Sequence, residues 1–276
     1  MKAAIIPNLD KTHTRDIVGK AFEVLTQNGI ESLLPASVFS AFCLGSVCPD
    51  EEIYRMADWV ICIGGDGTIL HTAKKAAMEN KPVLGINAGR VGFMAGLERD
   101  ELERLALLKS GKYTLENRML LQASIPSAGK VFYCLNDAVV SKGSLARMVD
   151  ITVNLEGEQI SYRADGLIAA TPSGSTAYSM SAGGPILDPS IESIILTPIC
   201  PHSLFSRSIL LSADAVITIS AAGAPGTRVY LSIDGEETHQ LDSDTHVKIR
   251  RANDQTVRLI KLKKGSFYQT LSRKLM

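Results

Sequence analysis

The first 110 or so residues alternate short apolar runs with longer segments in which apolar positions recur at helical spacing. Two of the runs, WVICI at Trp59–Ile63 and PVLGI at Pro82–Ile86, are typical of strands buried on both faces of a sheet. The predicted strands are Lys2–Pro7, Glu31–Pro35, Trp59–Ile63 and Pro82–Ile86, and the predicted helices are Thr14–Gln27, Ile69–Glu79 and Asp100–Lys109. This alternation predicts a parallel sheet with helices on both faces.

After Gly111 the pattern changes to short strands separated by Gly, Pro, Ser and Asp turns. The predicted strands are Val131–Val140, Asp150–Leu155, Leu167–Thr171, Ala215–Ser220, Val229–Ile233 and His246–Arg250, and helical pattern is confined to Ser175–Ala182 and Asp188–Leu196. The tail predicts a strand, Val257–Leu262, and a helix, Ser266–Leu275, that return to the first domain. We therefore expect an α/β domain, residues 1–112 with about 256–276, and a β-rich domain, residues 113–255.

The composition is that of a globular protein without a strongly charged surface. The 276 residues are 45% hydrophobic, and 29 basic side chains balance 29 acidic ones, so we expect neither nucleic acid nor a membrane as partner. No run of about 18 apolar residues occurs, and the first apolar run, ending at Pro7, is too short for a signal peptide. Five cysteines without a C-x-x-C pair favour reduced thiols, with Cys62 and Cys134 buried, and a cytoplasmic protein.

The run WVICIGGDGTIL places a glycine turn between a predicted buried strand and a predicted helix. Its glycines let the backbone approach a ligand closely, and the free N–H groups at the start of the helix suit a phosphate. The pattern is neither the dinucleotide-fold G-x-G-x-x-G nor the P-loop. Asp66, inside the turn, is unfavourable beside a phosphate unless it holds a metal or accepts a proton, and both belong to phosphoryl transfer. The alternative is that Asp66 only caps the helix.

A second segment, YRADGLIAATPSGSTAYSMSAGGP, spans residues 162–185. It predicts a buried strand, a turn and a short helix whose first residues carry small hydroxyls, which can cap the helix or bind a polar ligand. Tyr178 can stack on a flat group, and Asp165 suits ribose hydroxyls or an exocyclic amine. An ordinary capping loop is the alternative. A serine nucleophile is disfavoured because G-x-S-x-G is absent.

Both segments resemble motifs of known kinases. GGDGT is similar to a motif shared by NAD kinases, diacylglycerol and sphingosine-type lipid kinases and phosphofructokinases, so it implies phosphoryl transfer but not the acceptor. Thr171–Pro185 closely resembles the TP[TS]GSTAYS-x-SAGGP signature of the NAD kinase family. Ile86–Met94, Leu135–Asp137 and Pro201–Arg207 resemble three further segments of that family, so the resemblance covers roughly residues 59–240.

The chain departs from the family pattern at three places. The usual Asn-Glu pair is Asn136-Asp137, and the usual Asp-Gly-Gln is Asp-Gly-Glu at residues 234–236. The loop that begins INAGR lacks the basic residue often seen after its asparagine, and Arg90 lies two positions further on. These departures concern substrate contacts rather than the class of reaction.

The resemblance implies a phosphotransferase with an alcohol group as acceptor, which moves the γ-phosphoryl group of ATP to the 2′-hydroxyl of the adenosine ribose of NAD. Asp66 is then the candidate catalytic residue, as general base or hydroxyl orienter, with a divalent cation such as Mg²⁺ bound together with ATP and no metal ligand assigned in the protein. The residues implied to bind NAD and ATP are Asp66, Gly67, His71, Asn136, Asp137, Arg147, Arg163, Asp165, Thr176, Ala177, Tyr178 and Ser181. For the two arginines and His71, a solvated surface role is an equal alternative.

Two other function classes stay open on the sequence. A diacylglycerol-type lipid kinase would share GGDGT but would need an apolar acceptor pocket or a membrane-binding surface, which the neutral charge disfavours. A non-catalytic dinucleotide sensor is disfavoured by Asp66, because binding alone gains little from a carboxylate beside phosphates. The resemblance also implies a homodimer or homotetramer. The motifs leave open ATP or polyphosphate as donor, and NAD or NADH as acceptor.

Overall fold

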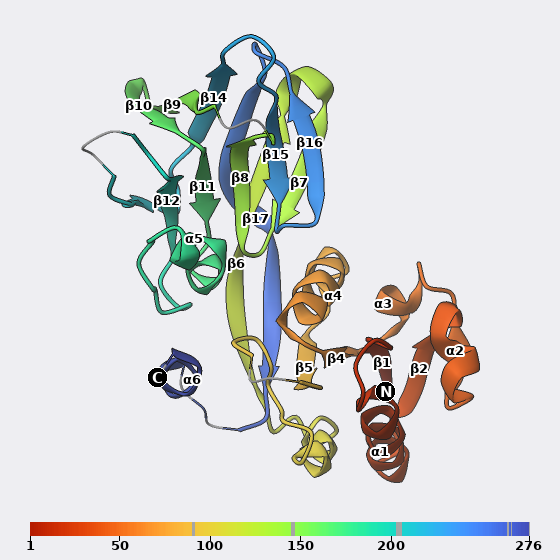
Figure 1. Cartoon of the computed structure of the whole chain (residues 1–276). Helices are drawn as coiled ribbons and strands as arrows, with labels where there is room; N and C mark the ends of the chain where they lie inside the picture. Colours follow the sequence, from red (N-terminus) through yellow and green to blue (C-terminus); the bar gives the residue numbers. More distant parts are fainter. Residues whose placement is uncertain (90–91, 145–146, 203–205, 264, 266, 276) are drawn as a thin grey trace. The chain divides into compact units, whose positions relative to one another are not determined.

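The computed structural model describes residues 1–89, 92–144, 147–202, 206–263, 265 and 267–275 (Figure 1). The chain divides into two compact units, one of Met1–Asn117 with Gln255–Met276 and one of Arg118–Asp254. The boundary falls inside two strands, β6 (Thr114–Ile125) and β17 (His246–Lys261), which therefore contribute residues to both units.

The first unit is built on a parallel sheet. Its strands are β1 (Lys2–Pro7), β2 (Glu31–Pro35), β3 (Ser46–Cys48), β4 (Trp59–Gly64) and β5 (Val83–Asn87). Their order is β3-β2-β1-β4-β5, and the last part of β17 follows β5, with Leu259 beside Val83. All of these pairings are parallel. The C-terminal segment thus returns to this sheet, as the sequence predicts.

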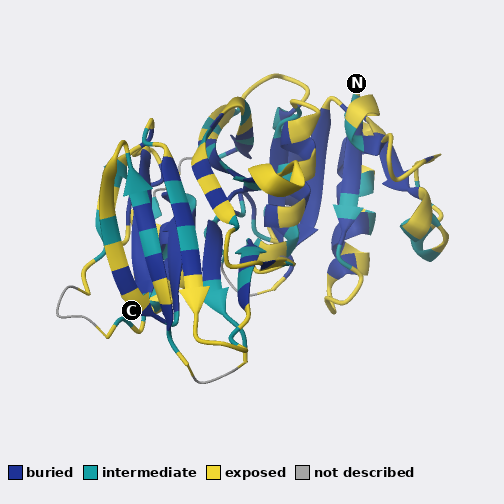
Figure 2. Cartoon of the chain, turned by 90° about the horizontal axis from the view of Figure 1, so that it is seen from above, coloured by how far each residue is buried: buried dark blue, intermediate teal, exposed yellow. Residues whose placement is uncertain are grey.

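Helices cover both faces of this sheet, whose central strands are buried while the outer sides of the helices are exposed (Figure 2). On one face, side chains such as Ile5 and Ile61 pack against α1 (Thr14–Gln27) and the 3₁₀ helix η1 (Leu102–Leu107). On the other face, Cys62 of β4 shares a hydrogen bond with Thr72 of α4 (Asp66–Met78). Among the described residues, the unit also contains the helices α2 (Ala36–Phe42), α3 (Ile53–Met56) and α6 (Phe267–Leu275).

Two of the predicted helices in this unit have wrong boundaries or the wrong type. α4 begins at Asp66, earlier than predicted, so the aspartate belongs to the first turn of the helix. The segment predicted as an α-helix over Asp100–Lys109 is the shorter 3₁₀ helix η1. The buried residues of this segment are Leu102, Leu105 and Leu108, which pack into the core of the unit. Their spacing matches the three residues per turn of a 3₁₀ helix. The short elements α2, β3 and α3 were not predicted.

The second unit is a sandwich of antiparallel strands. One sheet has the order β13-β12-β11-β8-β15-β16, and the other strands run β10-β9-β14-β17, with β6 beside β17 and β7 beside β6. The bounds are β7 (Lys130–Cys134), β8 (Asp137–Lys142), β9 (Val149–Leu155), β10 (Glu158–Ala164), β11 (Gly166–Ala170), β12 (Ser193–Ile199), β13 (Ile209–Ser212), β14 (Ile217–Gly223), β15 (Val229–Ile233) and β16 (Glu237–Leu241). Buried side chains from both sets of strands, such as Leu167 and Val247, form one core.

Strand boundaries differ from the prediction at two places in the chain. The segment Val131–Val140 is two strands, β7 and β8, separated by Leu135 and Asn136. Conversely, the segments His246–Arg250 and Val257–Leu262 are covered mostly by one long strand, β17, which needs no break because both ends are paired. The strands β6, β10, β13 and β16 were not predicted.

The helical predictions in this unit fail more clearly. The helix predicted over Asp188–Leu196 is wrong: the buried run Ile194–Leu196 lies in β12, which is paired on both sides by β11 and β13. The helix predicted over Ser175–Ala182 is a 3₁₀ turn, η3 (Ser173–Thr176), followed by the single turn α5 (Tyr178–Ser181). Within the part of the chain that the structure describes, no helix has both the length and the apolar character needed to cross a membrane.

Candidate active site

The glycine turn of the first unit lies at the carboxyl end of β4, whose six residues are all buried. A Cβ atom at Gly64 would lie 2.7 Å from the Cβ of Thr68, so only glycine lets the strand and the first turn of α4 pack this closely. At Gly67 the opposite holds, because a Cβ atom there would meet nothing within 4 Å. The start of α4 therefore has open space beside Gly67, where a ligand can approach the backbone.

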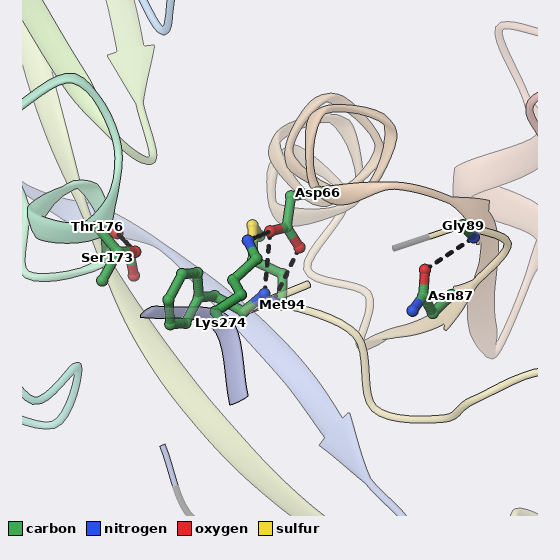
Figure 3. Close-up of polar contacts among 8 residues, drawn as sticks. Asp66, Asn87, Gly89, Met94, Ser173, Thr176 and Lys274 are labelled. Atoms are coloured by element: carbon green, nitrogen blue, oxygen red, sulfur yellow. Dashed lines mark hydrogen bonds and ion pairs between the residues drawn. The ribbon is translucent and has the colours of Figure 1, made fainter. Parts of the chain in front are cut away.

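The carboxylate of Asp66 is held by the loop that follows β5 (Figure 3). Its Oδ2 atom accepts a hydrogen bond from the backbone N–H of Phe93 at 2.9 Å, and Oδ1 accepts one from Met94 at 3.1 Å. A Cβ atom at Gly92 would overlap Oδ1, so a side chain at this position would displace the Asp66 carboxylate. The ammonium group of Lys274 on α6 lies 3.2 Å from Oδ2. No side chain caps α4, so the alternative in which Asp66 serves only as its cap is not supported.

Asn87, at the end of β5, fixes the beginning of the same loop. The residue is buried, and its Nδ2 donates to Oε2 of Glu98 at 2.8 Å. Its Oδ1 accepts a hydrogen bond from the N–H of Gly89 at 2.9 Å (Figure 3). Hydrogen bonds therefore hold the described residues of the loop to Asn87 as well as to Asp66. Arg90, the basic residue noted in this loop, lies outside the described residues, and His71 is exposed on α4.

The second unit contains a cavity of about 340 Å³. Its lining residues are Asn136, Asp137, Val139, Ser141, Ala177, Tyr178, Ser232, Asp234 and Gly235. Four of the residues proposed from the sequence to bind substrate, Asn136, Asp137, Ala177 and Tyr178, are thus brought together from segments about 40 positions apart. The Tyr178 side chain is among the exposed large hydrophobic groups, at 47%. Its ring is therefore available for stacking on a flat ligand.

Asp234 organises this cavity, a role that sequence reasoning missed. Its carboxylate accepts hydrogen bonds from the backbone N–H groups of Leu135 at 3.0 Å, Asn136 at 2.8 Å and Asp137 at 3.0 Å. These bonds interrupt the chain between β7 and β8, so two strands form there. The strand pattern of Val131–Val140 contains no sign of this distant partner, and it therefore predicted one strand. Asp234 and Gly235 both have positive φ, as a tight hairpin turn requires. The Asp-Gly pair was thus a turn signal, but nothing in the pattern indicated its distant partners.

The two carboxylates of the cavity influence each other. Asp137 is 4% exposed, and burial raises the pKa of its carboxyl group to about 7, with a further contribution from the charge of Asp234. A carboxyl group with this pKa is partly protonated near neutral pH. Asp137 can therefore donate a hydrogen bond as well as accept one.

Most hydroxyl groups of the turn after β11 hold the turn together. Thr171 donates its hydroxyl to the carbonyl of Leu135 at 2.5 Å, and the N–H of Gly174 donates back to Thr171 Oγ1 at 3.1 Å. A Cβ atom at Gly174 would overlap the carbonyl oxygen of Asn136. The buried Arg118 donates from Nη1 to Ser173 Oγ at 3.0 Å. The turn is therefore packed directly against the Leu135–Asp137 segment that lines the cavity.

The other proposed substrate residues of this unit do not line the cavity. Thr176 donates its hydroxyl to the carbonyl of Ser173 at 3.3 Å (Figure 3), and Ser181 is exposed. Asp165 forms an ion pair with Lys142 at 2.8 Å. Arg147 and Arg163 are both exposed, in line with the solvated-charge alternative as well as with a ligand contact.

The glycine turn of the first unit contains one carboxylate, that of Asp66. Among the described residues, no group of three His, Cys, Asp or Glu side chains is arranged to hold a metal ion. Mg²⁺ commonly keeps several waters and binds through one or two carboxylates together with substrate phosphates. The residues present therefore fit a cation that arrives with a nucleotide better than one held by the protein alone.

Comparison with known proteins assigns the family. The model of the ATP-NAD kinase N-terminal domain matches residues 47–108, and that of the ATP-NAD kinase C-terminal domain matches residues 135–262. The NAD kinase of Symbiobacterium thermophilum is 40% identical, covering 99% of this chain and 98% of the relative. That of Natranaerobius thermophilus is 35% identical, with coverage of 98% and 96%. The chain belongs to the ATP-NAD kinase family.

Solved structures share the fold of this ATP-NAD kinase family member. A yeast NADH kinase complexed with NADH has a TM-score of 0.90 at 23% identity, covering 100% of this chain and 87% of the other. An NAD kinase from Archaeoglobus fulgidus in complex with ATP has a TM-score of 0.79 at 27% identity, with coverage of 100% and 98%. The predicted fold class, an α/β part with a parallel sheet and a β-rich part, is confirmed.

Proposed function

We propose that the chain is an NAD kinase, which transfers the γ-phosphoryl group of ATP to the 2′-hydroxyl of the adenosine ribose of NAD and forms NADP. The observation that carries the proposal is that one chain contains both a carboxylate held in a glycine turn, that of Asp66, and a cavity lined by Tyr178 and by polar groups such as Asn136. The 35–40% identity to curated NAD kinases over nearly the whole chain supports it. A lipid acceptor is disfavoured because carboxylate and amide groups line this cavity.

Asp66 is the proposed catalytic residue. Its carboxylate, fixed by two backbone N–H groups, orients the acceptor hydroxyl and takes its proton as the oxygen–phosphorus bond forms and the bond from phosphorus to ADP breaks. The open side of α4 at Gly67 offers backbone N–H groups to donor phosphates. A divalent cation bound with ATP would neutralise charge on those phosphates. Positioning is the main contribution of the protein in this reaction class.

The cavity of the second unit is the proposed site for part of the dinucleotide. At about 340 Å³ it is at the small end of ligand pockets, so it suits a nucleoside rather than the whole of NAD. Tyr178 would stack on the flat group, while Asn136 and Asp137 would hydrogen-bond the ribose or the base. The further proposed contacts are His71, Arg147, Arg163, Asp165, Thr176, Ala177 and Ser181.

The deciding experiment supplies the purified chain with ATP, Mg²⁺ and one of three acceptors: NAD, NADH or diacylglycerol. We expect NADP to form, measured by coupling to an NADP-specific dehydrogenase. Phosphorylation of diacylglycerol without NADP formation would overturn the proposal. Binding of NAD without turnover would favour the sensor. Replacing ATP by polyphosphate in the same assay defines the donor.

We further propose a cytoplasmic location and a homo-oligomeric state. All five cysteines are thiols rather than disulfides, and Cys48, Cys62 and Cys134 are buried, which suits a reducing compartment. The assembly into a dimer or tetramer rests on the family resemblance. Light scattering after size-exclusion chromatography would measure the mass of the particle against the 29.7 kDa of one chain.

A further inference from the structure

The C-terminal helix α6 contacts the loop that holds Asp66 at two points. The ring of Phe267, in the first turn of α6, lies 6.0 Å from the ring of Phe93, centroid to centroid. In the last turn, the ammonium group of Lys274 lies 4.2 Å from the centroid of the same Phe93 ring. Residues seven positions apart lie on one face of a helix, so the spacing of Phe267 and Lys274 places both against Phe93.

The same ammonium group also reaches the catalytic carboxylate. Lys274 Nζ lies 3.2 Å from Asp66 Oδ2, the oxygen that accepts the N–H of Phe93 (Figure 3). The lysine thus contacts Asp66 directly and contacts the ring of the residue whose backbone holds Asp66. The pair is only partly shielded, with side-chain exposures of 32% for Lys274 and 33% for Asp66. An ion pair this exposed adds little to the stability of the fold.

A contact with little value for stability can still have a large effect on geometry. Each oxygen of the Asp66 carboxylate accepts a hydrogen bond from one backbone N–H group, and a third donor, on Oδ2, further restricts the rotation of the group. Phosphoryl transfer depends on placing the acceptor hydroxyl in line with the donor phosphorus, and small displacements reduce the rate strongly.

We propose that Lys274 is a positioning residue for phosphoryl transfer, and that α6 serves to bring its ammonium group onto Asp66. This inference rests on the proposed NAD kinase function. It assigns a task to the C-terminal helix, which lies outside both matched family segments. Lys274 acts through Asp66 and is not required for binding NAD.

The test is a set of four variants assayed for NADP formation: Lys274→Met, Lys274→Arg, Asp66→Asn and the double variant Lys274→Met/Asp66→Asn. Arg273→Met is the matched control, because it removes a neighbouring, exposed charge of the same helix. We expect Lys274→Met to lower kcat about ten-fold, the scale of a misplaced catalytic group, with KM for NAD changed less than about two-fold. Lys274→Arg should restore most of the loss, and Arg273→Met should behave as wild type.

The double variant decides whether Lys274 works through Asp66. If it does, Lys274→Met should have no further effect on the residual rate of Asp66→Asn. If Lys274→Met lowers kcat by the same factor in the wild type and in Asp66→Asn, the proposal is overturned. An unchanged kcat in Lys274→Met would also overturn it, and so would an increased kcat, which would indicate an inhibitory contact. A loss matched by a lower melting temperature and shared by Arg273→Met would indicate a structural role and would also overturn it. Wild-type protein without NAD kinase activity would instead refute the proposed function.

Discussion

Each unit of the molecule contains one aspartate that we propose to contact substrate, and the two lie in opposite environments. Asp66 is one-third exposed and accepts from two backbone N–H groups and the Lys274 ammonium group. Asp137 is buried, and the charge of a second carboxylate, Asp234, acts on it. The first environment supplies hydrogen-bond donors to the carboxylate of Asp66, whereas the burial of Asp137 raises its pKa and favours the neutral carboxyl group. We infer that the reaction and the recognition of its acceptor place different electrostatic demands on the same side chain.

The largest effect is expected from removing the charge at Asp66. Asp66→Asn should lower kcat by at least about 100-fold, the scale of losing a positioned acid–base group. The fold should stay intact, because the change keeps the shape of the side chain at a partly exposed position. Steady-state rates of NADP formation and a circular dichroism melt measure the two parts. Turnover like that of the wild type would remove Asp66 from the mechanism.

The same change at Asp137 should act on stability and on its dependence on pH. The pKa of this group is about 7 in the folded protein against an ordinary value of 3.8, so the folded state binds the proton more tightly and protonation stabilises the fold at low pH. That contribution is lost as pH rises through about 7, because the folded protein must then ionise a buried carboxyl group. Between pH 5 and pH 8 the wild type should lose about 2 kcal/mol more stability than Asp137→Asn does.

Denaturant unfolding at the two pH values measures this difference. Asp165→Asn is the matched control, since the Asp165 carboxylate is 32% exposed and paired with Lys142. If Asp137→Asn and wild type show the same change in unfolding free energy between pH 5 and pH 8, the contrast drawn between the two aspartates is wrong.

The smallest expected effect concerns the ring in the cavity. Tyr178→Ala should raise KM for NAD several-fold and leave KM for ATP nearly unchanged, because stacking on a flat group contributes about 1 kcal/mol. Tyr178→Phe, which keeps the ring, is the control and should retain the KM of the wild type. Equal increases for both substrates would place the ring elsewhere in the reaction.

Much of the first unit could be predicted because its signals are local. The helix α1 and the strands β1 and β2 have their predicted bounds, since each combines a clear pattern with a clear stop such as Asn28-Gly29. The position of Asp66 at the end of a buried strand was equally clear. Its partners were not, because Phe93 and Lys274 lie 27 and 208 positions away in the sequence.

The cavity of the second unit shows the same contrast between local signals, which the sequence reveals, and distant contacts, which it does not. The residues Asn136, Asp137 and Tyr178 were recognised from motifs that resemble a family, not from their own chemistry. The break between β7 and β8 depends on the carboxylate of Asp234, which lies 97 to 99 positions further along the chain. Strand pattern alone cannot reveal a bond of this range, so one strand was predicted.

Gly92 carries a consequence for how variants of this enzyme are interpreted. The room for the Asp66 carboxylate exists only because residue 92 has no side chain, since even a methyl group would overlap Oδ1. Gly92→Ala adds no charge and removes no functional group, and substitution tables score it as mild. We nevertheless expect Gly92→Ala to reduce activity in the same way as a change at Asp66 itself, because the added methyl group would occupy the space of the Asp66 carboxylate.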